Sequence, residues 1–117
     1  MLEDKAKELG RMIGQSTEYQ ALKRSSDALN EDGDAVTLLQ QMEKLRGEAQ
    51  QLIQRGENPS EEMELQLDQL LEKIQIQPTY QRAVTSQENF DKLMLRVNQW
   101  IMEGMKKGAA SPIITLS

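Results

Sequence analysis

The sequence contains neither cysteine nor histidine among its 117 residues. Cysteine thiolates form disulfides, hold iron–sulfur clusters and most structural zinc ions, and act as nucleophiles. Histidine is the usual general base near neutral pH, and a serine nucleophile normally needs such a base. No glycine-rich phosphate-binding loop is present either. We therefore expect a protein that is not an enzyme and that uses no cofactor and no metal.

Aromatic residues and long apolar runs are also scarce. Aromatic side chains make up 3% of the chain, so that a core must be built mainly from leucine, isoleucine, valine, methionine and alanine. No apolar run approaches the roughly 18 residues that span a bilayer, and the first ten residues, MLEDKAKELG, hold no apolar signal core. We expect a cytoplasmic protein with no membrane partner.

Basic residues are fewer than acidic ones, 14 against 19, which gives a net charge of −5. Binding a phosphate backbone normally requires a concentrated basic face, and Lys106 and Lys107 are too few to supply it. We expect no direct nucleic-acid partner. An RNA-binding module is the weaker alternative, and it would be dismissed if no salt-dependent RNA binding were found.

The chain is rich in helical periodicity. Between residues 34 and 55, small or apolar residues recur at alternating steps of four and three, which is the seam of a helix that needs a helical partner. Residues 2–14 and the segment after Ser60 repeat this pattern. The three seams are Leu38, Met42, Leu45, Ala49 and Leu52; Leu2, Ala6, Leu9 and Ile13; and Met63, Leu67, Leu70 and Ile74.

Capping and breaking residues divide this pattern into five helices. Ser16 or Thr17 is expected to cap a second helix, which residues 30–34 interrupt, with Gly33 supplying the turn. Asp32 or Asp34 then caps the third helix. Ser60 caps the fourth, Gln77-Pro78 ends it, and the fifth runs from about residue 79 to residue 105.

The fold class that follows is all-α: about five helices in an elongated, oligomeric bundle with two long helices. We expect residues 1–106 to form one helical domain. Residues 107–117 are expected to be a disordered tail, although the short apolar run at residues 113–116 could add to a partner's surface.

The fifth helix carries an apolar stripe that is too wide for one neighbouring helix. It either lies in the middle of its own bundle, or packs partly inside the chain and partly against a second subunit, in a dimer or tetramer. Large side chains in such a stripe tend to carry most of an interface's energy. The candidate interface residues are Tyr80, Val84, Phe90, Leu93, Met94, Val97, Trp100 and Ile101.

One acidic pattern superficially suggests a calcium loop. Asn30, Asp32 and Asp34 alternate as the first ligands of such a loop do, but the loop also needs glycine at its sixth position and glutamate at its twelfth. Counted from Asn30, those positions hold Ala35 and Gln41. A helix end followed by a helix cap explains these residues better.

Five segments in this order resemble the YlbF/YmcA family of bacterial regulators, which includes YheA-like proteins, over roughly residues 2–105. The segments are Glu18-Tyr19; Leu29, Asp34-Ala35 and Leu38-Leu39; Gln50-Gln51 with Gly56; Ile74 with Gln77-Pro78; and Phe90, Leu93, Val97 and Ile101. The resemblance implies an all-α oligomer without enzymatic activity.

In Bacillus-type bacteria, the family's members act with a third protein in an accessory complex. That complex influences RNase Y-dependent mRNA processing and, through it, competence, sporulation and biofilm formation. It also carries iron–sulfur clusters, to which this cysteine-free chain can contribute no thiolate. We therefore expect an oligomeric helical adaptor with other regulatory proteins as partners. The alternative is a structural or chaperone-like protein that binds clients in its grooves.

Overall fold

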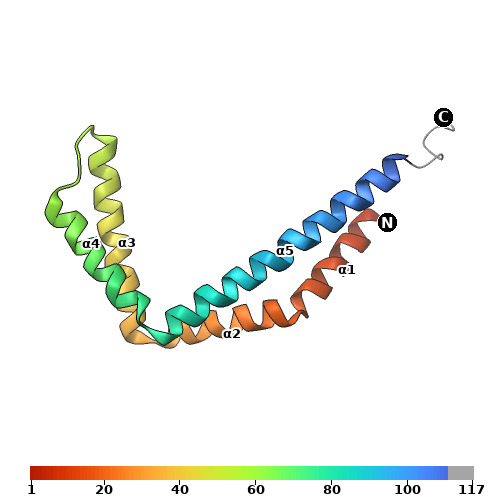
Figure 1. Cartoon of the computed structure of the whole chain (residues 1–117), viewed down its shortest axis with the longest axis horizontal. Coiled ribbons are helices and arrows are strands. Elements are labelled where there is room, and N and C mark those ends of the chain that lie inside the picture. The colour runs from red at the N-terminus through yellow and green to blue at the C-terminus, as the bar shows by residue number, and fades with distance from the viewer. Residues whose placement is uncertain (111–117) are drawn as a thin grey trace.

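The computed structural model describes residues 1–110, and within this range the chain forms five helices and no strand (Figure 1). The expected all-α class with five helices is confirmed, as are the two long helices, α3 with 22 residues and α5 with 33. The helices are α1 (Leu2–Gly14), α2 (Thr17–Glu31), α3 (Gly33–Gln54), α4 (Glu61–Gln75) and α5 (Pro78–Ala110).

Side-chain caps begin three of these helices. The Ser16 hydroxyl accepts a hydrogen bond from the backbone N–H of Tyr19 at 3.1 Å, and the Ser60 hydroxyl accepts one from Met63 at the same distance. Each satisfies a backbone donor that the first turn of a helix leaves free. Asp32, rather than Asp34, caps α3.

Two expectations about boundaries need correction. Gly33 does not supply the turn before α3; it is the first residue of that helix, and the break consists of Asp32 alone, with φ −83° and ψ 98°. Helix α5 continues to Ala110 and so passes through residues 107–110, which were expected to belong to the tail. The apolar run at residues 113–116 lies outside the described residues.

The helices are arranged as two arms that meet at a corner (Figure 1). Antiparallel α3 and α4 form one arm, and α2 packs along α5 in the other. The molecule measures 67 × 37 × 19 Å, and its radius of gyration is 21.5 Å, compared with about 13 Å for a compact chain of this length. The expected elongation is therefore present, and it results from this two-armed shape.

The main core lies at the corner. Ala35 and Met42 of α3 and Ile74 of α4 are buried there, and partly buried residues from α2 to α5 surround them. Val97 of α5 is the one other buried residue within residues 1–110. The surrounding residues are Leu29, Leu38, Leu39, Leu70, Leu71 and Tyr80. A core this small leaves most of each arm only half covered.

Candidate protein interaction surface

The eight candidate residues lie along α5, which at 33 residues is about 50 Å long. At its N-terminal end, Tyr80 packs against the corner core. Further along, the ring of Phe90 lies 5.6 Å from that of Tyr19 in α2, tilted by 59°, a favourable geometry for an aromatic pair. Tyr80 and Phe90 therefore already pack against other residues of the same chain.

The middle of the stripe is also covered. Val97 is 4% exposed, and Leu93 and Met94 are half-buried. Together with Tyr80 and Phe90, five of the eight candidates thus have at least part of their surface buried by the chain itself. The first half of the stripe is an internal packing face.

The remaining three candidates are more exposed. Trp100 is 57% exposed, Ile101 44% and Val84 37%. At about 100° per residue, Ile101 lies within about 40° of the direction of Val97, whereas Val84 lies about 140° away. Val84 thus belongs to a different face of α5, and the sequence prediction combined two faces. Trp100 and Ile101 extend the buried face beyond the point where the chain covers it.

An ion pair lies near the end of this covered part of α5. A guanidinium nitrogen of Arg96 lies 3.8 Å from a carboxylate oxygen of Glu18, in the first turn of α2. The pKa of Glu18 is lowered, chiefly by its own backbone N–H, then by the Thr17 hydroxyl, with Arg96 contributing less. The pair is exposed and therefore weakly stabilising. The pair matters because of where it lies. Glu18 is at the start of α2, whereas α5 continues for more than ten residues beyond Arg96.

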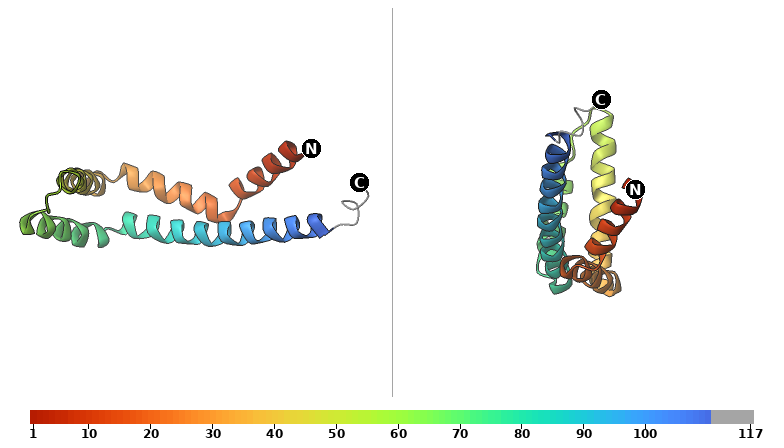
Figure 2. Two further views of the ribbon diagram at one scale, coloured as in Figure 1. Left: turned by 90° about the horizontal axis from the view of Figure 1, so that it is seen from above. Right: turned by 90° about the vertical axis from the view of Figure 1, so that its right-hand side faces the viewer.

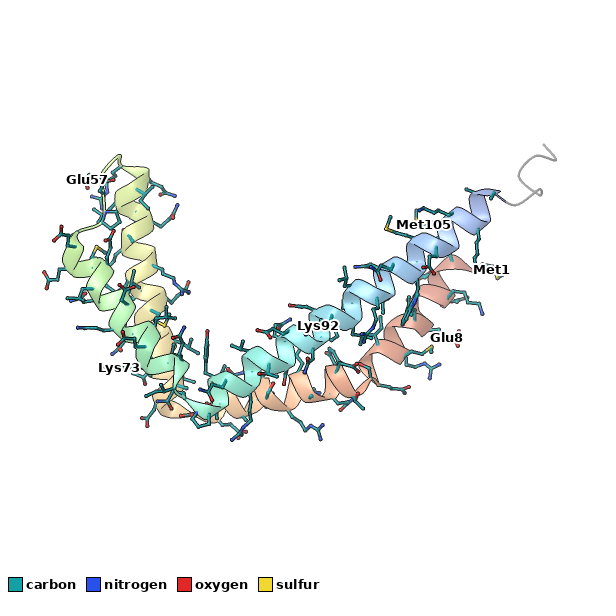
Figure 3. All side chains as sticks on the ribbon, viewed as in Figure 1. Met1, Glu8, Glu57, Lys73, Lys92 and Met105 are labelled. Atoms are coloured by element: carbon teal, nitrogen blue, oxygen red, sulfur yellow. The ribbon has the colours of Figure 1, made fainter. Side chains whose placement is uncertain are left out.

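Beyond Arg96, α5 runs beside α1 instead of α2, and α1 points away from α5 (Figure 1 and Figure 2). Figure 2 shows the two helices diverging toward the chain's N-terminus. Among the described residues of α1, none is fully buried, and Leu2 at its start is 84% exposed. Met105 on α5 is 67% exposed. Met1 and Met105 lie at the same end of the molecule (Figure 3).

The sequence prediction did not include α1 or Met105 in the interface. The signal for α1 was available, since Leu2, Ala6, Leu9 and Ile13 form a regular stripe. The stripe alone could not show that α1 would be left without a covering partner. That depends on the direction in which α1 leaves α2.

Two open grooves follow the helix pairs. One, of about 610 Å³, lies between α2 and α5, and the other, of about 400 Å³, between α3 and α4. The first is lined by Ala21, Arg24, Ser25, Ala28, Pro78, Gln81, Arg82, Thr85 and Ser86, and the second by Gln41, Lys44, Leu45, Glu48, Gln66, Gln69, Leu70 and Lys73. Both linings mix polar and apolar groups without a convergent set of catalytic side chains.

The residues that resemble a calcium loop have structural positions. Asn30 lies in α2, Asp32 caps α3 and Asp34 lies in the first turn of α3. Within residues 1–110, no group of three acidic side chains is arranged to hold a metal ion. The helices in this range also include none that is long and apolar enough to cross a membrane.

Comparisons with known proteins identify the family of this chain. The sequence model of the family described as "Control of competence regulator ComK, YlbF/YmcA" matches residues 2–106. A UPF0342 protein of Streptococcus mutans is 32% identical over 73% of this chain and 75% of its own length. One from Streptococcus gordonii is 28% identical, over 86% and 89% respectively.

A UPF0342 protein of Limosilactobacillus reuteri is 24% identical over 84% of this chain and 80% of its own length. The names of these relatives state no activity. The family match spans all five helices almost to the end of α5. The resemblance predicted from the sequence is thus confirmed, and the chain belongs to the YlbF/YmcA family.

Proposed function

We propose that this chain is a non-enzymatic regulator that works through protein–protein contacts, as a homo-oligomer, in the cytoplasm. Its family is described by control of the competence regulator ComK, a regulatory role. The observation that carries the proposal is the exposure of Trp100 on the same face of α5 as buried Val97. A large aromatic side chain next to apolar neighbours is typical of the centre of a protein interface.

In its finer form, the proposal is that the chain serves as an accessory factor of RNase Y-dependent mRNA processing, together with other regulatory proteins. The net charge of −5 supports contact with proteins rather than direct contact with RNA. Because the chain has no cysteine, any iron–sulfur cluster in such a complex would be held by a partner's thiolates.

The test is made in the bacterium that carries this chain. The gene is deleted, and the 5′ ends of transcripts are mapped in the deletion strain and in a strain depleted of RNase Y. We expect the two strains to share a set of altered ends, and a tagged chain to copurify with a fixed set of regulatory proteins. Unaltered ends would contradict the finer proposal. Copurification of many unrelated proteins without fixed stoichiometry would favour the chaperone-like alternative.

A further inference from the structure

The diverging ends of α1 and α5 present apolar side chains that the described part of the chain covers only in part. We define the distal surface as five residues on these two helices. They are Leu2 and Leu9 of α1 and Trp100, Ile101 and Met105 of α5. Leu9 is half-buried, and the other four are between 44% and 84% exposed.

The distal surface continues a seam whose other half is already paired. On α5, Met94 and Val97 are covered, and Ile101 follows at the next step of four. Gly104 and Gly108 extend the line at steps of three and four. A seam of this period packs against another helix. Small residues on it let that helix approach closely. The occupant of the distal surface should therefore be helical.

The chain also exposes more surface than a monomer of its size normally does. Its accessible surface is 9267 Å², compared with about 6,500 Å² for a compact folded protein of 13.3 kDa. Residues 111–117 can account for at most about 1,000 Å² of the difference. The remainder, roughly 1,800 Å², is more than the ~800 Å² per partner that a stable interface buries.

Charge favours a second copy as the occupant. Residues 33–77, which include α3 and α4, contain nine acidic and four basic residues and therefore carry the whole net charge of −5. The rest of the chain has ten of each sign. Within α1 the signs also balance, with Glu3, Asp4 and Glu8 against Lys5, Lys7 and Arg11. Two copies that meet at their distal surfaces bring neutral arms together, and the acidic arms lie at the other end of each molecule.

We infer that the distal surface is the self-association site of this chain, where α1 and α5 of one copy pack against α1 and α5 of another to form a four-helix bundle. A two-fold arrangement pairs the same surface with itself, so that one patch is sufficient. The inference rests on the homo-oligomeric part of the proposed function and names the surface through which the copies associate. Trp100 then lies inside the bundle.

The first experiment measures the solution mass of the full chain by light scattering over a dilution series. We expect the wild type to be a dimer or larger at micromolar concentration. Ile101→Asp should raise the dissociation constant at least 100-fold, since it places a charge in the bundle. The matched control is Met102→Asp, because Met102 is the next residue and is 57% exposed, but lies about 140° from the direction of Val97.

Leu2→Asp provides a second variant that cannot disturb the chain's own core, since Leu2 is 84% exposed. It should also weaken association, and circular dichroism should show unchanged helix content. A monomeric wild type would overturn the inference. So would equal weakening by Ile101→Asp and Met102→Asp, or no weakening by either. An oligomer that ignores Ile101→Asp and Leu2→Asp would leave the homo-oligomeric proposal standing and refute only this surface.

The single tryptophan reports on the same question independently. In one copy Trp100 is 57% exposed, so that its fluorescence should be readily quenched by acrylamide. On association its emission should shift to shorter wavelength, and quenching should fall with rising protein concentration. Met102→Asp should keep this dependence, and Leu2→Asp should lose it. A Trp100 signal that is independent of concentration while the mass rises would show that association uses another face.

Discussion

The carboxylate of Asp32 connects the start of α3 with Thr79 at the start of α5, 47 residues further along the chain. Its Oδ1 accepts a hydrogen bond from the backbone N–H of Ala35 at 3.3 Å, which caps α3. Its Oδ2 accepts one from the hydroxyl of Thr79, in the first turn of α5, at 2.7 Å. Asp32 thereby fixes the corner at which the two arms meet.

Replacing this carboxylate should weaken the corner. Asp32→Ala removes both hydrogen bonds and should lower the thermal midpoint, because the first turn of α3 loses its cap. Asp34→Ala is the matched control, since Asp34 lies two residues further on in the first turn and does not cap the helix. Differential scanning calorimetry at one protein concentration compares the two variants. An equal decrease in both would contradict the assigned role of Asp32.

The same carboxylate should make stability depend on pH. The pKa of Asp32 is lowered, first by the Thr79 hydroxyl and then by the backbone N–H of Ala35. Since the folded pKa lies below the unfolded value of about 4, folding favours the charged form. The contribution is present above that value and is lost as the pH falls through the folded pKa.

Thr79→Val isolates this contribution, because it removes the hydroxyl while keeping the shape of the side chain. The wild type should lose more stability between pH 6 and pH 3 than the variant does, with both followed by thermal unfolding. Other carboxylates titrate equally in the two proteins. Identical pH profiles would show that the bond between Thr79 and Asp32 is not made in solution.

Most helix boundaries could be predicted because they depend on neighbouring residues. Ser16 and Ser60 are caps by residue type and position, and both form the expected bonds. The end of α5 could not be predicted in this way. The helix was expected to end near residue 105 but continues through Gly108 to Ala110, because a glycine costs a helix only about 1 kcal/mol and does not oblige it to stop.

The two-armed shape could not be predicted, because it depends on contacts between distant residues. Nothing local to Asp32 indicates that Thr79 will meet it. Similarly, the exposure of Trp100 depends on the turn between α1 and α2, where the Ser16 hydroxyl donates to the carbonyl of Ile13 at 2.6 Å and the Gln20 amide to that of Gly14 at 2.9 Å. Periodicity identified the stripe on α5 but not which part of it the chain would cover.

The corner core should dominate the stability of the chain. Ile74 has no exposed surface, so Ile74→Ala should reduce the free energy of unfolding by about 2–5 kcal/mol through lost burial and a residual cavity. Ile76→Ala is the matched control, two residues further on and 72% exposed, and should change it by less than about 0.5 kcal/mol. Urea unfolding at a fixed protein concentration measures both. Similar losses of stability in the two variants would mean that Ile74 is not part of the main core.

Two glycines in and after α3 should respond to alanine with opposite signs. Gly56 follows the helix with φ 79°, and the N–H of Glu57 donates to the carbonyl of Leu52 at 2.8 Å, which is a Schellman termination. Gly56→Ala should destabilise by about 1 kcal/mol. Gly47 lies within α3, and a methyl group added there would meet no atom of another described residue within 4 Å, apart from its own helix turn. Gly47→Ala should therefore stabilise by up to about 1 kcal/mol. Thermal unfolding that showed the same sign for both would contradict this assignment.

Val97 and Trp100 lie one helical turn apart on α5, and they should separate folding from assembly. Val97 is 4% exposed, so Val97→Ala should lower the free energy of unfolding of the single chain by about 1–3 kcal/mol. Trp100→Ala should change that quantity less when it is measured in dilute protein, because the side chain is already 57% exposed in the single chain. At higher concentration, where copies associate, Trp100→Ala should lower the thermal midpoint relative to the wild type, since association stabilises the folded state by mass action. A loss from Trp100→Ala that is the same at every concentration would mean that the indole packs within its own chain.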